Sequence, residues 1–432
     1  MGTRRFDVLV VGAGPAGSIA ALVLARAGAD VALVDKARFP RDKACGDFVG
    51  PRGLQVLADL AVPEPPGLDV GDMVVVGPTG RRVLLPCFDG TTYPGRARAV
   101  IRTVLDDALR TAALEAGAVP IEGRADRPVG SDADLDGFTL SSGDELRADF
   151  VIGADGATSH VAQTAGLVED ARVLWGFAVR TYLDQQVDLP AITLWERTRW
   201  HAFPGYGWIF PSPGGGANVG VGVGTLADRR AGAEAVRVLP AYLDHLVGLG
   251  LLQRAPAGPL PRRLGGWLKM GMVGTTPAAG RVLLVGDAAG LVNPLQGEGI
   301  AQAMASGRAA AGAILASPGS AATRYRHELA RAHLPYQRIT AAGHAALVGR
   351  PRAVAAVGRL ITAPVVGKAV AGGWGIFWNE LLDGAAPGGA RKVAAASTWF
   401  GRAVTSASAV SRWFASAFDD DRPERLWEAG SS

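Results

Sequence analysis

The sequence predicts an α/β protein with three parts: a doubly wound, Rossmann-like lobe that is discontinuous along the chain, an inserted antiparallel β-sheet, and a C-terminal helical region. Three observations predict this arrangement. A strand, a glycine-rich loop, a helix and a strand open the chain over 8–35, strands of the same lobe return at 138–156 and 281–289, and strand-like runs alternate with turns over 172–224. The predicted domains are 1–170 with 276–335, then 171–275, then 336–432, and a hairpin within 70–95 joins the second domain.

The first thirty-five residues predict a dinucleotide site. The β-branched run 8–11 leads into the glycine-rich loop, an Ala-rich stretch with helical composition follows over 18–27, and a second apolar strand ends in Asp35. In such a loop Gly12 permits the tight turn, Gly14 lets the backbone approach a pyrophosphate, and Gly17 lets helix and strand pack closely. The helix N-terminus offers N–H groups to the phosphates, and Asp35 can accept both hydroxyls of an adenosine ribose. The predicted cofactor-binding residues of this segment are Gly12, Gly14, Pro15, Ala16, Gly17, Asp35 and Lys36.

Two later segments favour FAD over NAD. The segment 138–156 reads as a hairpin and a strand that ends beside Asp155, and the segment 281–289 is a strand that ends in Gly286 and Asp287. Asp287 can hold ribityl hydroxyls of a flavin, and an ordinary helix N-cap is the alternative interpretation. The loop 293–299 and the helix after it can direct N–H groups at N1 and the C2 carbonyl of the isoalloxazine, where reduced flavin carries negative charge. Agreement among three separated segments favours FAD and adds to the predicted site Asp155, Gly286, Asp287, Pro294, Gly297, Gly299 and Ile300.

Three motifs carry a resemblance to a known family. They are 39–47 (FPRDKACGD), 206–211 (YGWIFP) followed by Gly220-Val221-Gly222, and the stretch 286–307. On these motifs the chain resembles the geranylgeranyl reductase family of FAD-dependent oxidoreductases, which has a para-hydroxybenzoate hydroxylase-like fold, and within it the actinobacterial menaquinone reductases. Phe203 departs from the family pattern, which has a proline there and not at Pro204. Gly290 stands where the aromatic hydroxylases usually have a histidine.

The resemblance implies roles for three further residues. Cys45 and Gly46 belong to the family's Cys-Gly-Asp segment, where the chain passes near the flavin. The Cys45 thiol could donate a proton or tune the flavin potential, and a buried small hydrophobe is the alternative. Arg102 stands where the family places an arginine against FAD, and otherwise it would be a surface charge. Cys87 has no motif around it and is expected to be structural.

An aromatic strand in the inserted sheet predicts the substrate wall. Tyr206, Trp208 and Phe210 recur with a period of two, so all three side chains point to one face of a strand. Beside a flavin, such a face suits a flat ring or a polyprenyl chain, and hydrophobic core is the alternative. The candidate catalytic residues are Cys45, Tyr206 and Trp208, and the candidate substrate residues are Tyr206, Trp208, Phe210 and Gly297. No metal site is predicted.

The activity implied by the resemblance is that of an FAD-dependent reductase. It would saturate C=C bonds of a prenyl chain, on an isoprenoid lipid or a menaquinone side chain, by hydride transfer from reduced flavin, with NADPH or a reduced carrier as electron donor. Such a site needs a dry, apolar channel, and 191–225 contains few ionisable groups. The alternative is an FAD-dependent monooxygenase or halogenase that tailors an aromatic or polyketide natural product. A halogenase would need a lysine deep in the pocket, and we expect none in this lobe. A non-catalytic flavin-binding protein is a third possibility.

Composition and the C-terminal quarter bound the partners. The 432 residues indicate two or three lobes, the net charge of +4 does not favour nucleic acid, and two cysteines favour a reducing, cytoplasmic compartment. Between Arg324 and Lys368 there are eight basic residues and one acid, and seven tryptophans and phenylalanines follow over 374–414. This pattern fits a segment lying on an anionic membrane surface, with helices packed on the flavin lobe as the alternative. The same arginines could instead dock NADPH or an electron carrier. The oligomeric state stays open.

Overall fold

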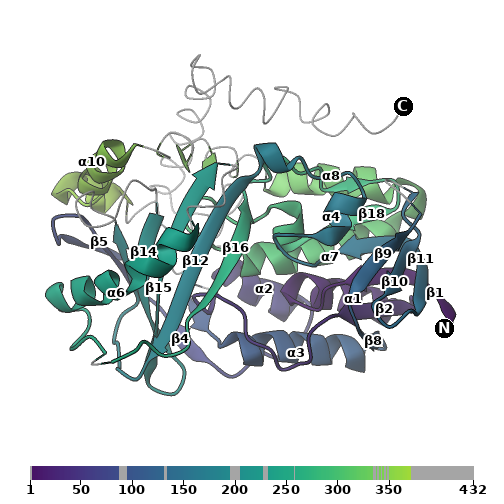
Figure 1. Cartoon of the computed structure of the whole chain (residues 1–432), viewed down its shortest axis with the longest axis horizontal. Coiled ribbons are helices and arrows are strands. Elements are labelled where there is room, and N and C mark those ends of the chain that lie inside the picture. The colour runs from purple at the N-terminus through teal and green to yellow at the C-terminus, as the bar shows by residue number, and fades with distance from the viewer. Residues whose placement is uncertain are drawn as a thin grey trace, which may run out of the picture.

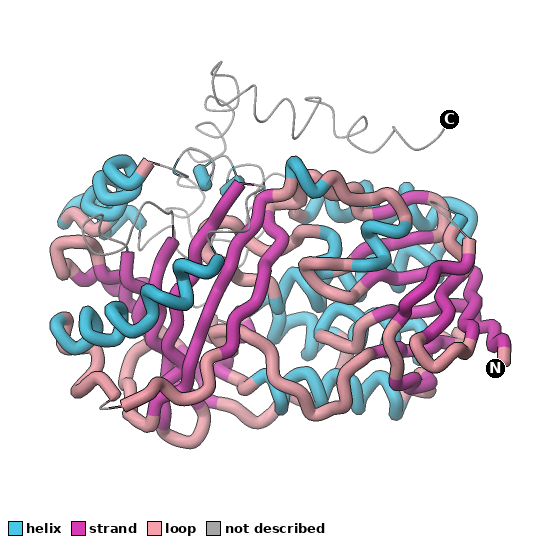
Figure 2. Tube along the Cα trace, viewed as in Figure 1, coloured by secondary structure: helices cyan, strands magenta, loops and turns pink. Residues whose placement is uncertain are grey.

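The computed structural model shows two lobes side by side (Figure 1). Helices gather around the sheet of the first lobe, whereas long strands dominate the second (Figure 2). The structure describes residues 2–86, 95–130, 134–194, 205–226, 232–256, 258–333, 337, 340–341, 343–344, 347 and 350–370.

An eight-stranded sheet forms the core of the first lobe, which we call the flavin lobe. Its main path runs β17-β18-β11-β1-β2-β8, and the pairs from β18 to β8 are parallel. β18 pairs with β11 although more than a hundred residues separate them, which confirms a discontinuous lobe. The strands are β1 (Thr3–Val11), β2 (Val31–Asp35), β8 (Val119–Glu122), β9 (Ala125–Val129), β10 (Gly137–Leu140), β11 (Glu145–Gly153), β17 (Ala278–Ala279) and β18 (Val282–Leu284).

Helices cover this parallel sheet, as its two-sided apolar strands require. α1 (Pro15–Arg26) packs against both α3 (Arg102–Glu115) and α7 (Ile300–Ala316), and most of its residues are buried. A helix that is apolar on nearly every side is typical of such a central position. The remaining helices of the lobe are α2 (Pro51–Asp59), α4 (His160–Thr164) and α8 (Ala321–Ala332), with short 3-10 turns at η2 (Asp170–Arg172), η3 (Gly286–Ala289) and η4 (Pro318–Ser320).

A seven-stranded sheet forms the second lobe, which we call the substrate lobe. The order is β16-β12-β15-β14-β13-β5-β6, and every pair is antiparallel except β13 with β5. That parallel junction departs from the predicted all-antiparallel sheet, because the β5–β6 hairpin comes from a separate part of the chain. The strands are β5 (Met73–Val76), β6 (Arg82–Leu85), β12 (Leu174–Leu183), β13 (Ala191–Leu194), β14 (Gly205–Ser212), β15 (Gly216–Leu226) and β16 (Leu264–Met270).

The two faces of this sheet have different partners. One face packs on α6 (Gly232–Gly248) through side chains such as Ile209, Val221 and Tyr242. The other face looks toward the flavin lobe, and α10 (Pro351–Ile361) lies at its β5 end (Figure 1). A three-stranded sheet of β3 (Phe48–Val49), β7 (Ala97–Ala99) and β4 (Leu68–Val70) completes the described strands.

No single helix among the described residues is long and apolar enough to cross a bilayer. The helices Arg352–Ile361 and Pro364–Val370 form a bent pair that has the length and composition of a membrane span only when the two are counted together. Residues 371–432, which include Trp374 and the aromatic residues after it, lie outside the described part of the chain, so most of the predicted C-terminal region does too.

Candidate active site

The loop between β1 and α1 has the shape that a pyrophosphate requires. A Cβ on Gly12 would lie 2.3 Å from the Ala154 carbonyl oxygen, and one on Gly17 would lie 1.9 Å from the Gly12 carbonyl oxygen. Gly14 has more room: among the described residues, only an Arg41 guanidinium nitrogen, at 3.4 Å, lies within 4 Å of its would-be Cβ. Gly14 is the N-cap of α1, and no side chain caps the helix, so its first N–H groups stay available to an anion.

Asp35, the first of the three acids predicted at the cofactor, lies against the glycine loop. Asp35 accepts hydrogen bonds from the backbone N–H groups of Ala13 and Ala37, both at 2.8 Å, which places its carboxylate at the edge of the glycine loop. Lys36, next to it, is exposed.

Asp155, a predicted cofactor residue, supports the start of a helix in the structure. Its carboxylate accepts from Ser159 Oγ and from the backbone N–H groups of His160 and Val161, at 2.7 and 3.1 Å for the latter two. It therefore caps the start of α4, and both oxygens are engaged in doing so. What this segment adds to the dinucleotide loop is backbone, since Ala154 packs against Gly12.

The second flavin passage lies beside the start of α1, since a Cβ on Gly286 would lie 3.2 Å from the Ala16 Cβ. Asp287 Oδ2 lies 3.2 Å from Lys43 Nζ, and Asn293 Oδ1 accepts from the N–H groups of Leu295 and Gln296 to shape the loop before α7. Gly299 is the N-cap of α7, and it also lacks a side-chain cap.

We call the glycine loop 12–17, the segments around Lys43 and Arg102, and the segment 286–299 the flavin cradle. Close packing of α7 on α1 helps to hold these segments together. A Cβ on Gly307 would lie 2.2 Å from the Ala16 carbonyl oxygen, so the first turn of α1 packs on the middle of α7. The uncapped first N–H groups of α1 and α7 suit an anionic pyrophosphate and the electron-rich edge of a reduced flavin, so the residues present fit FAD.

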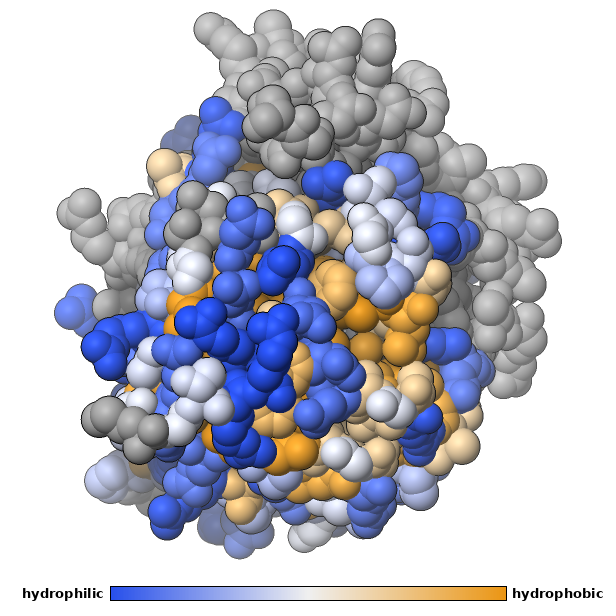
Figure 3. Space-filling view, turned by 90° about the vertical axis from the view of Figure 1, so that its right-hand side faces the viewer, coloured by the Kyte–Doolittle hydropathy of each residue, from blue (hydrophilic) through white to orange (hydrophobic). Residues whose placement is uncertain are grey.

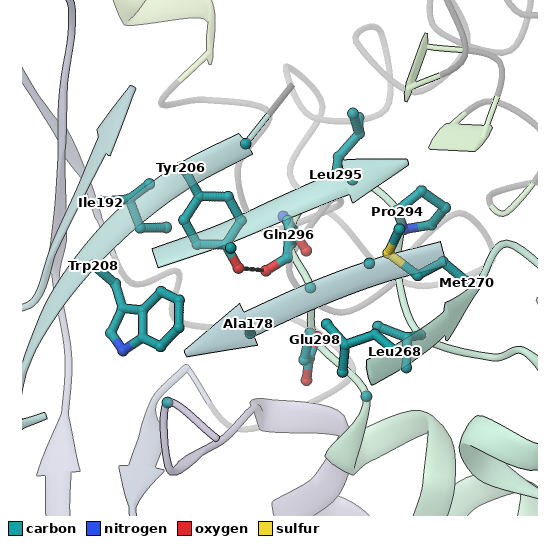
Figure 4. Close-up of a pocket in the computed structure, with 18 of the residues that line it drawn as sticks. Ala178, Ile192, Tyr206, Trp208, Leu268, Met270, Pro294, Leu295, Gln296 and Glu298 are labelled. Carbon is teal, nitrogen blue, oxygen red and sulfur yellow. Dashed lines mark hydrogen bonds between the residues drawn. The ribbon is translucent and has the colours of Figure 1, made fainter. Parts of the chain in front are cut away.

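A cavity of about 690 Å³ connects this cradle with the substrate lobe. At one end it is lined by Pro15, Asp287 and Ile300. At the other end its described lining is almost entirely apolar, and Figure 4 shows side chains from several strands converging on it. Among the described lining residues the charged side chains are Lys43, Arg102, Asp287 and Glu298. All four belong to the cradle segments, and the wall beyond them carries no charge in the part of the chain that is described.

The aromatic strand β14 faces this cavity. Tyr206, Trp208 and Phe210 all line it, whereas Ile209 between them packs toward α6, as a period of two requires. The Tyr206 hydroxyl donates to the Gln296 carbonyl of the flavin loop (Figure 4). Burial raises the pKa of Tyr206. Trp208 and Phe210 are buried, so these side chains are both core and pocket wall.

Alternate glycines on β15 make room for these rings. Gly220, Gly222 and Gly224 carry no side chain on the cavity face, while Val219, Val221 and Val223 face α6. A Cβ on Gly220 would lie 2.1 Å from the Trp208 ring, and one on Gly224 would lie 1.7 Å from the His344 ring. Above Gly222 the nearest atoms are 3.8 Å and more away, so this position borders open cavity.

Cys45 and Arg102 meet at the flavin end of the cavity. Arg102 makes a bidentate pair with Asp106, 2.7 Å for each bond, and Arg41 reaches the same carboxylate at 2.9 Å. The Cys45 sulfur accepts from the Asp47 N–H at 3.3 Å. Burial raises the pKa of Cys45, and the nearby Arg102 guanidinium offsets part of this rise. Cys45 is therefore held in its neutral thiol form, and the thiolate that remains when it loses its proton would lie near the Arg102 guanidinium.

Asp47 and Asn218 position Cys45, and neither was predicted as a site residue. Asp47 Oδ2 accepts from the Tyr182 hydroxyl at 2.6 Å and from Asn218 Nδ2 at 2.8 Å. Asn218 Nδ2 also donates to the Cys45 carbonyl at 2.8 Å, and its Oδ1 accepts from Trp208 Nε1 at 2.9 Å. Burial raises the pKa of Asp47. For Asp47 the local signal was its place in the Cys-Gly-Asp segment, and for Asn218 it was an amide side chain in a strand of small residues.

Two further residues correct or extend the prediction. Lys269 on β16 does belong to the substrate lobe, where no lysine was expected. It is buried and its Nζ donates to the Ala288 carbonyl at 3.0 Å, and it is not among the described residues that line the cavity. His344 lines the cavity, and its Nδ1 is 3.0 Å from the Pro294 carbonyl, to which it donates. Burial lowers the pKa of His344 to about 4. Cys87, Phe203 and Pro204 lie outside the described residues.

Comparison with known proteins supports the same assignment. Residues 5–189 match the model of the FAD binding domain family. The chain is 38% identical to a menaquinone reductase of Mycolicibacterium smegmatis over 71% of this chain and 76% of the relative. It is 34% identical to digeranylgeranylglycerophospholipid reductase 2 of Methanopyrus kandleri over 71% and 76% of the two chains.

Solved structures share the fold. A geranylgeranyl bacteriochlorophyll reductase-like protein from Thermoplasma acidophilum superposes with a TM-score of 0.69 at 22% identity, covering 88% of this chain and 99% of that one. The flavin-dependent brominase Bmp2 gives a TM-score of 0.64 at 17% identity, over 92% and 100% of the two chains. At these identities the likeness shows the fold alone. Taken with the sequence relatives, the chain belongs to the geranylgeranyl reductase family of FAD-dependent oxidoreductases, which act on C=C bonds of prenyl chains.

Proposed function

We propose that this chain reduces isolated C=C bonds in the polyprenyl part of a lipid, either a menaquinone side chain or another isoprenoid lipid. The observation that carries the proposal is the cavity of about 690 Å³ that joins the flavin cradle to an aromatic and aliphatic wall, which is uncharged in the described part of the chain. An isolated alkene has no carbonyl for an enzyme to polarise, so positioning in a dry channel is the main help available.

The residues at the cradle can complete the reduction. Bound FAD, once reduced, would supply a hydride to one alkene carbon. The second carbon then needs a proton, and the Cys45 thiol is the donor that faces the cavity. Its conjugate thiolate is stabilised by the Arg102 guanidinium. The Tyr206 proton is already bonded to the Gln296 carbonyl, so Tyr206, with Trp208, holds the alkene in place.

The test is anaerobic turnover of the FAD-loaded protein. The enzyme is reduced with dithionite and mixed with a polyprenyl lipid, and products are analysed by mass spectrometry. We expect a gain of two mass units per reduced bond. A gain of sixteen units in air, with coupled oxygen consumption, would instead indicate a monooxygenase and overturn the proposal. A colourless protein that does not take up FAD would overturn the cofactor assignment as well.

Cys45 variants test the proton donor separately. For Cys45→Ala we expect a fall of about 100-fold in the rate of flavin reoxidation by substrate, because general acids typically contribute at least that much. Cys45→Ser keeps a donor of similar size and should recover part of the rate. Flavin absorbance per protein checks that both variants retain FAD. A Cys45→Ala rate equal to wild type would exclude Cys45 as the donor.

The electron donor is also part of the proposal: NADPH or a small reduced carrier. Its support is the basic stretch from Arg324 to Lys368, which complements an anionic donor. Anaerobic mixing with NADPH should bleach the flavin absorbance. If NADPH leaves the flavin oxidised while a reduced carrier bleaches it, the carrier is the donor.

A further inference from the structure

We infer that α10 and the helix after it, Pro364–Val370, form a membrane-facing portal that passes a lipid chain from an anionic bilayer into the cavity. We call this pair the portal helices. The inference rests on the proposed function, since only a lipid substrate gives such a portal a use.

The inner face of the portal helices is part of the cavity wall. The lining residues that they supply are Val354, Val357, Gly358, Ile361, Ala369 and Val370. Close packing anchors the pair on the β5–β6 hairpin. A Cβ on Gly77 would lie 2.1 Å from Thr362 Oγ1, and one on Gly367 would lie 2.8 Å from a Val83 methyl group. These helices therefore sit at the edge of the substrate cavity and not on a remote surface.

The outer surface of the same helices exposes large apolar side chains. Val365 is 81% exposed and Leu360 is 57% exposed, and no other exposed large hydrophobic side chain in the described part of the chain exceeds these values. Val357, which also lines the cavity, is 39% exposed. Clustered exposed apolar side chains mark interaction surfaces, and continuity between this surface and an apolar cavity suits a lipid chain.

The positive charge of the portal helices favours an anionic surface. Arg350, Arg352, Arg359 and Lys368 are exposed, and the sequence contains no acidic residue from 329 to 379. Basic residues beside exposed apolar side chains favour the interface of an anionic bilayer, at about 1 kcal/mol for each basic residue near the surface. A protein partner that bound here would need an acidic patch with an apolar centre.

The geometry indicates a pair that lies on the membrane surface. Arg352–Ile361 and Pro364–Val370 meet at an angle of 83°, and each is far shorter than the roughly 20 residues that a spanning helix needs. Figure 1 shows α10 at the substrate-lobe end of the molecule. Figure 3 looks at the opposite end, formed by the flavin lobe, where hydrophilic side chains cover much of the described surface and apolar ones lie among them.

Vesicle binding tests the portal with the full-length, FAD-loaded protein. We expect the protein to sediment with vesicles of phosphatidylglycerol and phosphatidylcholine at low salt, to be released by high salt, and to bind vesicles of phosphatidylcholine alone at least tenfold more weakly. The double variant Leu360→Asp/Val365→Asp should lower binding to the anionic vesicles by at least tenfold. Leu189→Asp is the matched control, because Leu189 is also exposed (48%) and lies before β13; it should bind as wild type does.

Turnover provides the second measurement. The double variant should reduce a long polyprenyl lipid embedded in vesicles about tenfold more slowly than wild type does. Since Leu360 and Val365 do not line the cavity, a short soluble prenyl alcohol should be reduced at the wild-type rate. Flavin content and the melting temperature check folding. Wild-type protein that stays in the supernatant with anionic vesicles, or a double variant that sediments like wild type, overturns the portal. Absence of reduction of every prenyl substrate refutes the proposed function instead.

Discussion

Glycine residues have different structural roles in the two lobes. In the flavin lobe the missing side chains let backbone meet backbone. Cβ atoms on Gly12, Gly17 and Gly307 would lie 2.3, 1.9 and 2.2 Å from carbonyl oxygens. In the substrate lobe the missing side chains on β15 leave room for rings, with Trp208 over Gly220 and His344 over Gly224, and for open cavity over Gly222.

The difference separates what the fold requires from what the pocket requires. A carbonyl in a packed helix or turn cannot move without its whole element, so the flavin-lobe glycines are set by the architecture. A ring can rotate and an empty cavity can be filled, so the β15 glycines set the shape of the substrate site. We therefore expect substitutions of the flavin-lobe glycines to cost more folding free energy than substitutions of the β15 glycines. Substitutions on β15 should still slow turnover.

Gly307→Ala should give the largest loss of stability. The added methyl group meets the Ala16 carbonyl in the first turn of α1, and we expect the free energy of unfolding to fall by about 3 kcal/mol with weaker FAD retention. Thermal unfolding and flavin absorbance per protein measure both effects. Gly312→Ala in the same helix is the control: nothing lies within 4 Å of its Cβ, so it should gain about 0.5–1 kcal/mol. Equal effects of the two substitutions would contradict the comparison.

Gly220→Ala should have an intermediate effect. The Trp208 ring must move, which strains its bond to Asn218, and we expect a loss of about 2 kcal/mol in unfolding free energy. Flavin content should stay at the wild-type level, because the cradle is not touched. Denaturant unfolding and absorbance spectra are the measurements. Loss of FAD from this variant would show that the two lobes are not separable in this way.

His344→Asn should reveal a pH-dependent effect of about 2 kcal/mol between pH 7.5 and pH 5 and almost none at neutral pH. The unfolded histidine takes up a proton below about pH 6.5, whereas the folded one stays neutral until about pH 4. Stability of the wild type should therefore fall as the pH is lowered through this window, by about 1.4 kcal/mol per pH unit relative to the variant. Asparagine can still donate to the Pro294 carbonyl. Unfolding curves at pH 7.5 and 5 measure the difference, and a wild-type-to-variant gap that does not change with pH would rule the effect out.

Gly222→Val should have the smallest effect on stability and a clear effect on turnover. Only Trp208 and the Phe177 carbonyl come within 4 Å of its Cβ, and valine is favoured in strands, so we expect a change within about 0.5 kcal/mol. The side chain would occupy the cavity and should slow reduction of a polyprenyl substrate at least tenfold, with Gly222→Ala in between. A variant that is stable and fully active would show that the substrate does not pass over Gly222.

Local patterns were enough to predict much of the site. The helix that starts at Ile300, the β5–β6 hairpin and the common face of Tyr206, Trp208 and Phe210 all follow from composition and period. Each of these signals lies within one element, where the backbone repeat determines which side chains share a face. The support that Asp155 gives to α4 was not predicted, because an acid after a strand can serve a ligand or the next helix, and only the position of α4 shows the second role.

Local sequence patterns were enough to predict the cofactor lobe and the aromatic wall, because glycine spacing and strand period involve neighbouring residues. The resemblance to the family came from the three motifs. Only the folded chain shows that Asn218 supports Cys45 and that the Lys269 side chain bonds to the Ala288 carbonyl. The same is true of His344 and the portal helices, which line the cavity. These contacts join residues far apart along the chain, such as Cys45 and Asn218, which are 173 positions apart. Which of many polar side chains meet is set by the packing of whole elements, and no local pattern encodes that packing.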